Sequence, residues 1–299
     1  MTVERKPQAE PLTALADWRL PGRGEAAVDL AFRHRVKGLQ FDLGGPGRGP
    51  WLDAPGHPAR LARTARCAGV LPLGLAGNVL NDIGLTAAEG TLAAGRVRDV
   101  LGRLLDAAGE LGAPLVFVPS FRQSAIDSEA ALHRTAEVLR ATAEQAGAVG
   151  IRLASENTLA PEAALWLAEQ VASPAFRLLL DTYNPRQAGV DPAALVAATG
   201  AHLADQIHVK DGPADSDTTP LLGDGDGSIG DTLDAVARYG PPVRALVLEN
   251  DHRGGDTARL TEDLDRLRVL ATRLHGRTAA TGTAEAAGTT ETAGTWASY

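Results

Sequence analysis

The sequence contains one cysteine, Cys67, among its 299 residues, so no disulfide can form within the chain. Its opening segment, MTVERKPQAEP, lacks the apolar stretch of a secretory signal. No apolar run approaches the roughly 18 residues that a membrane helix requires. These absences predict a cytoplasmic protein that has no membrane partner.

Signatures of nucleotide and nucleic-acid binding are also missing. No Gly-x-Gly-x-x-Gly turn of the dinucleotide type follows an expected strand, and the Gly-rich segment DLGGPGRGPW at 42–51 lacks the Lys-Ser/Thr ending of a phosphate-binding P-loop. We interpret that segment as a flexible loop. The formal net charge is −8, and the Lys and Arg residues are scattered rather than gathered into a run. We therefore expect a small soluble substrate and no nucleic-acid partner.

The two ends of the chain have little to bury. Residues 1–11 are polar, and residues 277–299 form a low-complexity tract of Ala, Thr and Gly. Segments of this composition cannot offset the conformational entropy that folding removes, so we expect both to be disordered. The folded part is then a single domain over residues 12–276.

Within residues 12–276, short apolar runs alternate with longer amphipathic segments, which is typical of βα units on a parallel sheet. The amphipathic segments have helical periodicity; one example is Val97, Leu101, Leu104, Ala108 and Leu111. Eight such units predict a (β/α)₈ TIM barrel. A doubly wound open sheet is the alternative, but it usually has fewer strands. The expected strands cover residues 12–17, 38–43, 70–77, 114–119, 151–156, 177–182, 205–210 and 244–250.

Four consecutive strands carry a potential metal ligand at or near their carboxyl ends, where the functional residues of such a barrel lie. A single acidic residue at a strand end is commonly the N-cap of the next helix. Four residues in phase on four strands are not explained by independent capping. Three carboxylates and one imidazole suit a divalent ion, either Mn²⁺, Mg²⁺ or Co²⁺, with Zn²⁺ as a further option. The four residues are Glu156, Asp181, His208 and Glu249.

These strand ends resemble a known family. The segments RLASENT, LLLDTYN, IHVKD, LGDGDGSI and LVLEN resemble, in order and spacing, the motifs of strands five to eight in the xylose-isomerase-like TIM barrels. The resemblance implies that Glu156, Asp181, His208 and Glu249 bind one metal ion. It also implies that Glu156 and Glu249 are catalytic, one removing a proton next to a carbonyl and the other returning it, through an ene-diolate.

The sequence departs from the family pattern at two positions near these ligands. Several epimerases of the family have a His three residues after the metal Asp, where this chain has Asn184. Some members have an Arg soon after the metal His, where this chain offers Lys210. We expect Asn184 and Lys210 to contact substrate, with a salt bridge to Asp181 or a neighbouring carboxylate as the alternative for Lys210. Asn78 and Trp18, in loops of the first half, are candidates for substrate binding or for packing.

The sequence thus predicts a divalent-metal-dependent isomerase or epimerase of a small sugar or polyhydroxy carbonyl compound, acting in carbohydrate metabolism. A dehydratase of the inosose dehydratase type and a non-catalytic sugar-binding barrel remain alternatives. Endonuclease IV relatives need further histidines at strand ends, and FDLGG, GLAGN and FVPSF supply none. The resemblance also suggests a homo-oligomer, either a dimer or a tetramer.

Overall fold

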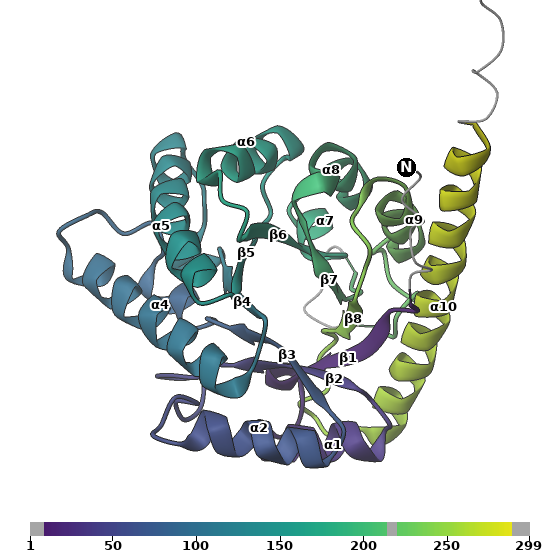
Figure 1. Ribbon diagram of the computed structural model, residues 1–299, viewed down its shortest axis with the longest axis horizontal. Helices are drawn as coiled ribbons and strands as arrows, with labels where there is room; N and C mark the ends of the chain where they lie inside the picture. The colour runs from purple at the N-terminus through teal and green to yellow at the C-terminus, as the bar shows by residue number, and fades with distance from the viewer. Residues whose placement is uncertain (1–8, 214–219, 289–299) are drawn as a thin grey trace, which may run out of the picture.

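Eight parallel strands form a closed barrel in the order β1 to β8, and the helices surround it (Figure 1). The structure, a computed structural model, describes residues 9–213 and 220–288, with side chains as far as residue 278. The predicted TIM barrel is therefore confirmed, and the expected strands differ from the observed ones only at their ends. The strands are β1 Leu12–Ala16, β2 Gly38–Asp42, β3 Leu71–Ala76, β4 Leu115–Pro119, β5 Arg152–Glu156, β6 Phe176–Asp181, β7 Leu203–Val209 and β8 Ala245–Leu248.

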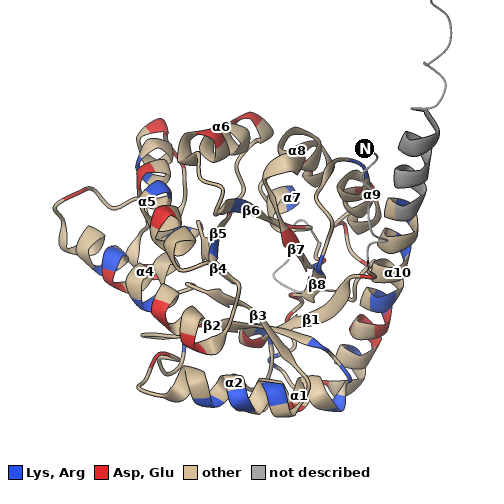
Figure 2. Ribbon diagram, in the orientation of Figure 1, with Lys and Arg blue, Asp and Glu red and all other residues tan. Residues whose placement is uncertain are grey.

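Helices follow each strand and cover the outside of the barrel. They are η1 Asp17–Arg19, α1 Glu25–Arg33, α2 His57–Cys67, α3 Leu80–Ile83, α4 Leu92–Leu111, η2 Arg122–Ser124, α5 Glu129–Ala148, α6 Pro161–Val171, α7 Asn184–Gln187, α8 Pro192–Thr199, η3 Gly200–His202, α9 Ile229–Tyr239 and α10 Thr257–Gly288. Charged residues of both signs lie on the outer helices (Figure 2). No helix in the described part of the chain is long and apolar enough to span a membrane.

The periodicity of α4 places its apolar residues against the barrel. All five residues of the predicted stripe are buried in the core. The helix begins where the Thr91 hydroxyl accepts a hydrogen bond from the Ala94 amide at 3.2 Å, and it ends at Gly112, whose φ of 75° a glycine adopts without strain. Local signals and tertiary packing therefore agree at both ends of this helix.

The register of the strands aligns the carboxyl ends that carry the predicted site. Asp181 on β6 pairs with His208 on β7, and His208 pairs with Val247 on β8. Glu156 is the last residue of β5, and Glu249 directly follows β8. Because all strands are parallel, these side chains meet at one end of the barrel.

The end of the domain differs from the expected boundary at residue 276. Helix α10 continues to Gly288. The predicted disordered tail is thus helical as far as Gly288. Residues 1–8 and 289–299 lie outside the described residues, so disorder there stays a prediction.

Candidate active site

A cavity of about 520 Å³ opens at the carboxyl ends of the strands. Six of the eight residues that the sequence singled out line this cavity, and the other two, Asp181 and His208, are buried beside it. Loops from both halves of the barrel contribute to its wall. The six lining residues are Trp18, Asn78, Glu156, Asn184, Lys210 and Glu249.

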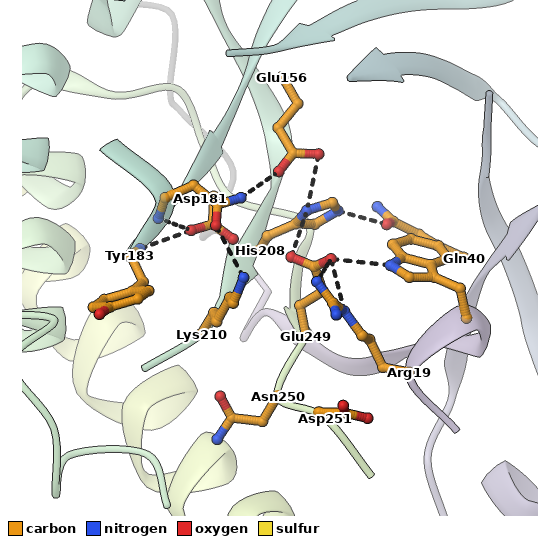
Figure 3. A network of polar contacts seen from close by, with 12 residues as sticks. Arg19, Gln40, Glu156, Asp181, Tyr183, His208, Lys210, Glu249, Asn250 and Asp251 are labelled. Atoms are coloured by element: carbon orange, nitrogen blue, oxygen red, sulfur yellow. Dashed lines mark hydrogen bonds and ion pairs between the residues drawn. The ribbon is translucent and has the colours of Figure 1, made fainter. Parts of the chain in front are cut away.

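The four predicted ligands converge on one point. Each offers one nitrogen or oxygen atom, and these atoms all lie within 4.8 Å of one another. His208 Nδ1 is 3.7 Å from Glu156 Oε2 and 3.6 Å from Glu249 Oε2, and the three side chains point toward one another in Figure 3. All four residues are buried, so water screens their charges poorly.

Three of the converging atoms have no hydrogen-bond partner among the described residues. They are Asp181 Oδ2, His208 Nδ1 and Glu249 Oε2, each fully buried. A buried polar atom without a partner is costly, and several acceptors that face one another repel unless a cation lies between them. The residues present therefore fit a metal ion, and this group could hold one.

A buried chain of hydrogen bonds fixes the orientation of the His208 ring. The side-chain amide nitrogen of Gln206, Nε2, donates to the Leu73 carbonyl at 2.8 Å. Gln40 Nε2 donates to Gln206 Oε1 at 2.9 Å. Gln40 Oε1 then faces His208 Nε2 at 2.7 Å. Because a backbone carbonyl can only accept, both amides must point the same way, and His208 Nε2 must be a hydrogen-bond donor. Nδ1 then faces the carboxylates of Glu156 and Glu249.

Asp181 has two separate roles, one for each oxygen. Its Oδ1 accepts hydrogen bonds from the amides of Tyr183 at 2.7 Å and Asn184 at 2.5 Å, at the start of α7. Its Oδ2 faces the cluster. The helix-capping interpretation and the ligand interpretation of this residue therefore both describe part of its geometry.

Asn184 and Lys210 form a chain that leads to Glu156. Asn184 Nδ2 donates to Glu156 Oε1 at 2.9 Å, and Lys210 Nζ donates to Asn184 Oδ1 at 2.9 Å. Among the residues that the structure describes, the Lys210 ammonium is hydrogen-bonded to Asn184 and makes no ion pair with Asp181. Both side chains line the cavity and can reach a ligand in it.

Glu249 is held by residues at the end of β1. Its Oε1 accepts from Trp18 Nε1 at 2.9 Å and from Arg19 Nε and Nη2 at 3.1 Å each. Trp18 thus positions Glu249 as well as lining the cavity. Arg19 was not predicted, and its only sequence signal is its place just after the first strand.

The pKa values of two buried carboxylates of the site, Asp181 and Glu249, are shifted in opposite directions. Burial, with the nearby charges of Glu249 and Glu156, raises the pKa of Asp181 to about 7, although Lys210 opposes the rise. Burial alone would also raise the pKa of Glu249, but Arg19, His208 and Lys210 bring it below its usual range. Glu249 is therefore ionised at neutral pH.

The loop after β7 is organised by Asp211, another residue that the sequence did not single out. Its carboxylate accepts hydrogen bonds from the amides of four glycines at 2.8–3.1 Å. A Cβ at Gly225 or Gly227 would lie 2.4 or 2.7 Å from Asp211 Oδ1, so only glycine fits there. The Asp211 carboxylate thus holds the GDGDGSI segment through its backbone amides. The four glycines are Gly212, Gly223, Gly225 and Gly227.

The barrel and this site define a class: (β/α)₈ proteins with buried acidic and histidine side chains at the carboxyl ends of strands five to eight. The chain belongs to the xylose isomerase-like TIM barrel family, whose model matches residues 28–269. It is 52% identical over 257 residues to a 2-epi-5-epi-valiolone 7-phosphate 2-epimerase from Actinoplanes sp., a match that covers 86% of this chain and 93% of that protein. The prediction of a sugar isomerase or epimerase is thereby confirmed.

Solved structures with lower identity share the fold. One is a fusion of a xylose isomerase-like TIM barrel with a 4-hydroxyphenylpyruvate dioxygenase, which matches with a TM-score of 0.68 and 19% identity over 86% of this chain and 41% of that one. Another is the IOLI protein with a bound zinc atom, which has a TM-score of 0.66 and 13% identity over 89% of this chain and 98% of that one.

Proposed function

We propose that the protein is a divalent-metal-dependent epimerase that inverts a carbon next to the carbonyl of a phosphorylated polyhydroxy ketone. The observation that carries the proposal is the convergence of Glu156 and Glu249, which line the cavity, on Nδ1 of the buried His208. The substrate class follows the Actinoplanes relative, which acts on 2-epi-5-epi-valiolone 7-phosphate.

Glu156, Asp181, His208 and Glu249 would hold the ion. When bound, it would stabilise the negative charge that develops on the carbonyl oxygen. This stabilisation lowers the barrier to removing a proton from the adjacent carbon. Mn²⁺, Mg²⁺ and Co²⁺ suit the carboxylate-rich set, and Zn²⁺ is also compatible with it.

The two glutamates would exchange protons with opposite faces of the substrate carbon. One carboxylate removes the proton to give an ene-diolate, and the other carboxyl group returns a proton from the opposite side. The reverse reaction uses the same two groups with their roles exchanged. Asn184 cannot exchange a proton near neutral pH, so proton transfer stays with the glutamates. Asn184 would bind substrate hydroxyl groups together with Lys210, Asn78 and Trp18.

Incubation with 2-epi-5-epi-valiolone 7-phosphate in D₂O tests the function. We expect the epimer to form with a single deuterium at the inverted carbon, detected by NMR and mass spectrometry. A sample without protein controls for spontaneous exchange. Loss of water from the product would instead indicate a dehydratase, and bound ligand without deuterium would indicate a binding barrel; either result contradicts the proposal.

Replacing Gln40 by leucine tests how the ion is held. The substitution removes the acceptor that fixes the His208 ring, and loss of such a supporting hydrogen bond weakens metal binding roughly 10- to 100-fold. Calorimetric titration of Mn²⁺ into each protein measures the change. Gln170→Leu, at an exposed position on α6, is the matched control and should bind Mn²⁺ like the unaltered protein. Equal affinity in the Gln40 variant would show that the amide chain does not position the ligand.

A further inference from the structure

Three arginines line the cavity wall on loops that follow β1, β2 and β4. Arg23 follows β1, Arg48 lies between β2 and α2, and Arg122 is in η2 after β4. The ligand residues come from β5–β8, and in a closed barrel β3 lies opposite β7. Arg48 and Arg122 therefore lie across the cavity from the ligands on β6 and β8, at what we call its basic end, although the chain as a whole has a net charge of −8.

One carboxylate holds two of these arginines in place. Asp82 Oδ2 accepts from Arg48 Nε at 2.6 Å, and Asp82 Oδ1 accepts from Arg122 Nη2. Among the described residues, Asp82 is the sole hydrogen-bond partner of both side chains. Each guanidinium has five N–H donors, so most of them remain available to a ligand. Two positive charges facing one negative charge also leave a net positive charge at this end.

The backbone of Arg122 adopts a conformation that its side chain does not favour. Its φ is 52°, in the left-handed region, at a position that does not end an α-helix. A non-glycine residue there costs about 1 kcal/mol or more, and such strain persists where surrounding structure imposes it. Two contacts do so: Asn81 Oδ1 accepts from the Phe121 amide at 2.8 Å, and Ser124 Oγ donates to the Leu80 carbonyl at 2.7 Å.

Arg23 completes the basic end through the backbone of Arg48. Its Nη1 donates to the Arg48 carbonyl and to Asp42 Oδ2, the latter at 2.9 Å. The loop over residues 42–51, expected to be flexible, is thereby tied to the segment between η1 and α1. Guanidinium groups held by neighbouring carboxylates form planar forks that match the oxygens of a phosphate.

We propose that Arg48 and Arg122, held by Asp82, bind the phosphate group of the substrate while its carbonyl end lies against Glu156 and Glu249. The identity of the reacting end rests on the proposed function; the anion site rests on the arginine geometry. A phosphate monoester fits better than a carboxylate because its dianion and three oxygens can accept from both guanidinium groups at once.

Direct binding of inorganic phosphate tests the anion site without any reaction. Calorimetric titration should show phosphate binding to the unaltered protein and binding at least 10-fold weaker in Arg48→Gln and in Arg122→Gln. Sodium acetate, titrated in parallel, should bind more weakly than phosphate. Arg98→Gln is the matched control, because Arg98 is exposed on α4 and pairs with Glu89 outside the cavity. Absent phosphate binding, tighter acetate binding, or equal phosphate binding in all variants would overturn the proposal.

Arg122→Gly separates loss of the side chain from damage to the fold. Glycine adopts the positive φ without strain, so the variant should unfold at the same temperature as the unaltered protein or higher, yet lose phosphate affinity like Arg122→Gln. With 2-epi-5-epi-valiolone 7-phosphate as substrate, we expect KM to rise 10- to 100-fold in the arginine variants. Deuterium incorporation by the unaltered protein reports separately on the proposed function, so that function can fail while the anion site stands.

Discussion

Glu156→Gln and Glu249→Gln are each expected to lower kcat for epimerisation by about 10²- to 10⁴-fold, which is the contribution of a positioned acid or base. Glutamine keeps the size of the side chain and one oxygen, but it cannot take up a proton. The fall in kcat should therefore exceed any change in KM. Steady-state kinetics with the phosphorylated ketone measures both constants, and Glu162→Gln, exposed on α6, is the matched control.

Each single variant should also separate exchange from inversion. The remaining glutamate can still remove a proton from the face that it contacts and return a deuteron to the same face. We therefore expect each variant to incorporate deuterium into one epimer without converting it, and the two variants to prefer opposite epimers. Normal turnover in either variant, or the same epimer labelled by both, would show that the glutamates do not work as a pair.

Removal of divalent ions is expected to abolish epimerisation and to lower the melting temperature by roughly 5 to 15 °C. An ion present at 100 to 1,000 times its Kd stabilises the folded state by about 3 to 4 kcal/mol, and a chain of this size melts a few degrees higher for each kcal/mol. The physical cause is the relief of repulsion among Glu156, Asp181 and Glu249, which are buried together.

Calorimetry on protein treated with a chelator, and then supplied with one ion at a time, measures this shift. His208→Gln should lose most of the response to added ion, because the imidazole Nδ1 is gone. His133→Gln, exposed on α5, should keep the full response. A melting temperature that does not change with Mn²⁺, Mg²⁺, Co²⁺ or Zn²⁺ would contradict a metal centre at these residues.

The four converging residues could be predicted because they depend on a simple rule. Parallel strands present their carboxyl ends together, so Glu156, Asp181, His208 and Glu249 were brought to one rim by strand order alone. The fold itself followed from the same alternation of strands and helices. What the rule cannot give is the direction of each side chain, and Asp181 shows this by turning one oxygen to α7 and the other to the site.

Residues that support the site from other strands were not predicted, because their roles depend on contacts across the barrel. Gln40 and Gln206 are separated by 166 residues in sequence yet share a hydrogen bond. A usable signal was present: Gln206 is two residues before His208, and residues two apart on a strand share a face. Arg48 and Arg122 gave no comparable signal, since loops place them beside Asp82.

The hydrogen-bond chain beneath His208 begins at an atom that no substitution can remove. The Leu73 carbonyl belongs to the main chain of β3. It sets the orientation of both glutamine amides, and hence the donor role of His208 Nε2. A change of side chain at residue 73 would alter packing but not this polarity. The donor role of His208 Nε2 is thus inherited from the barrel backbone, and it should persist in any variant that keeps the two glutamines and the strand register.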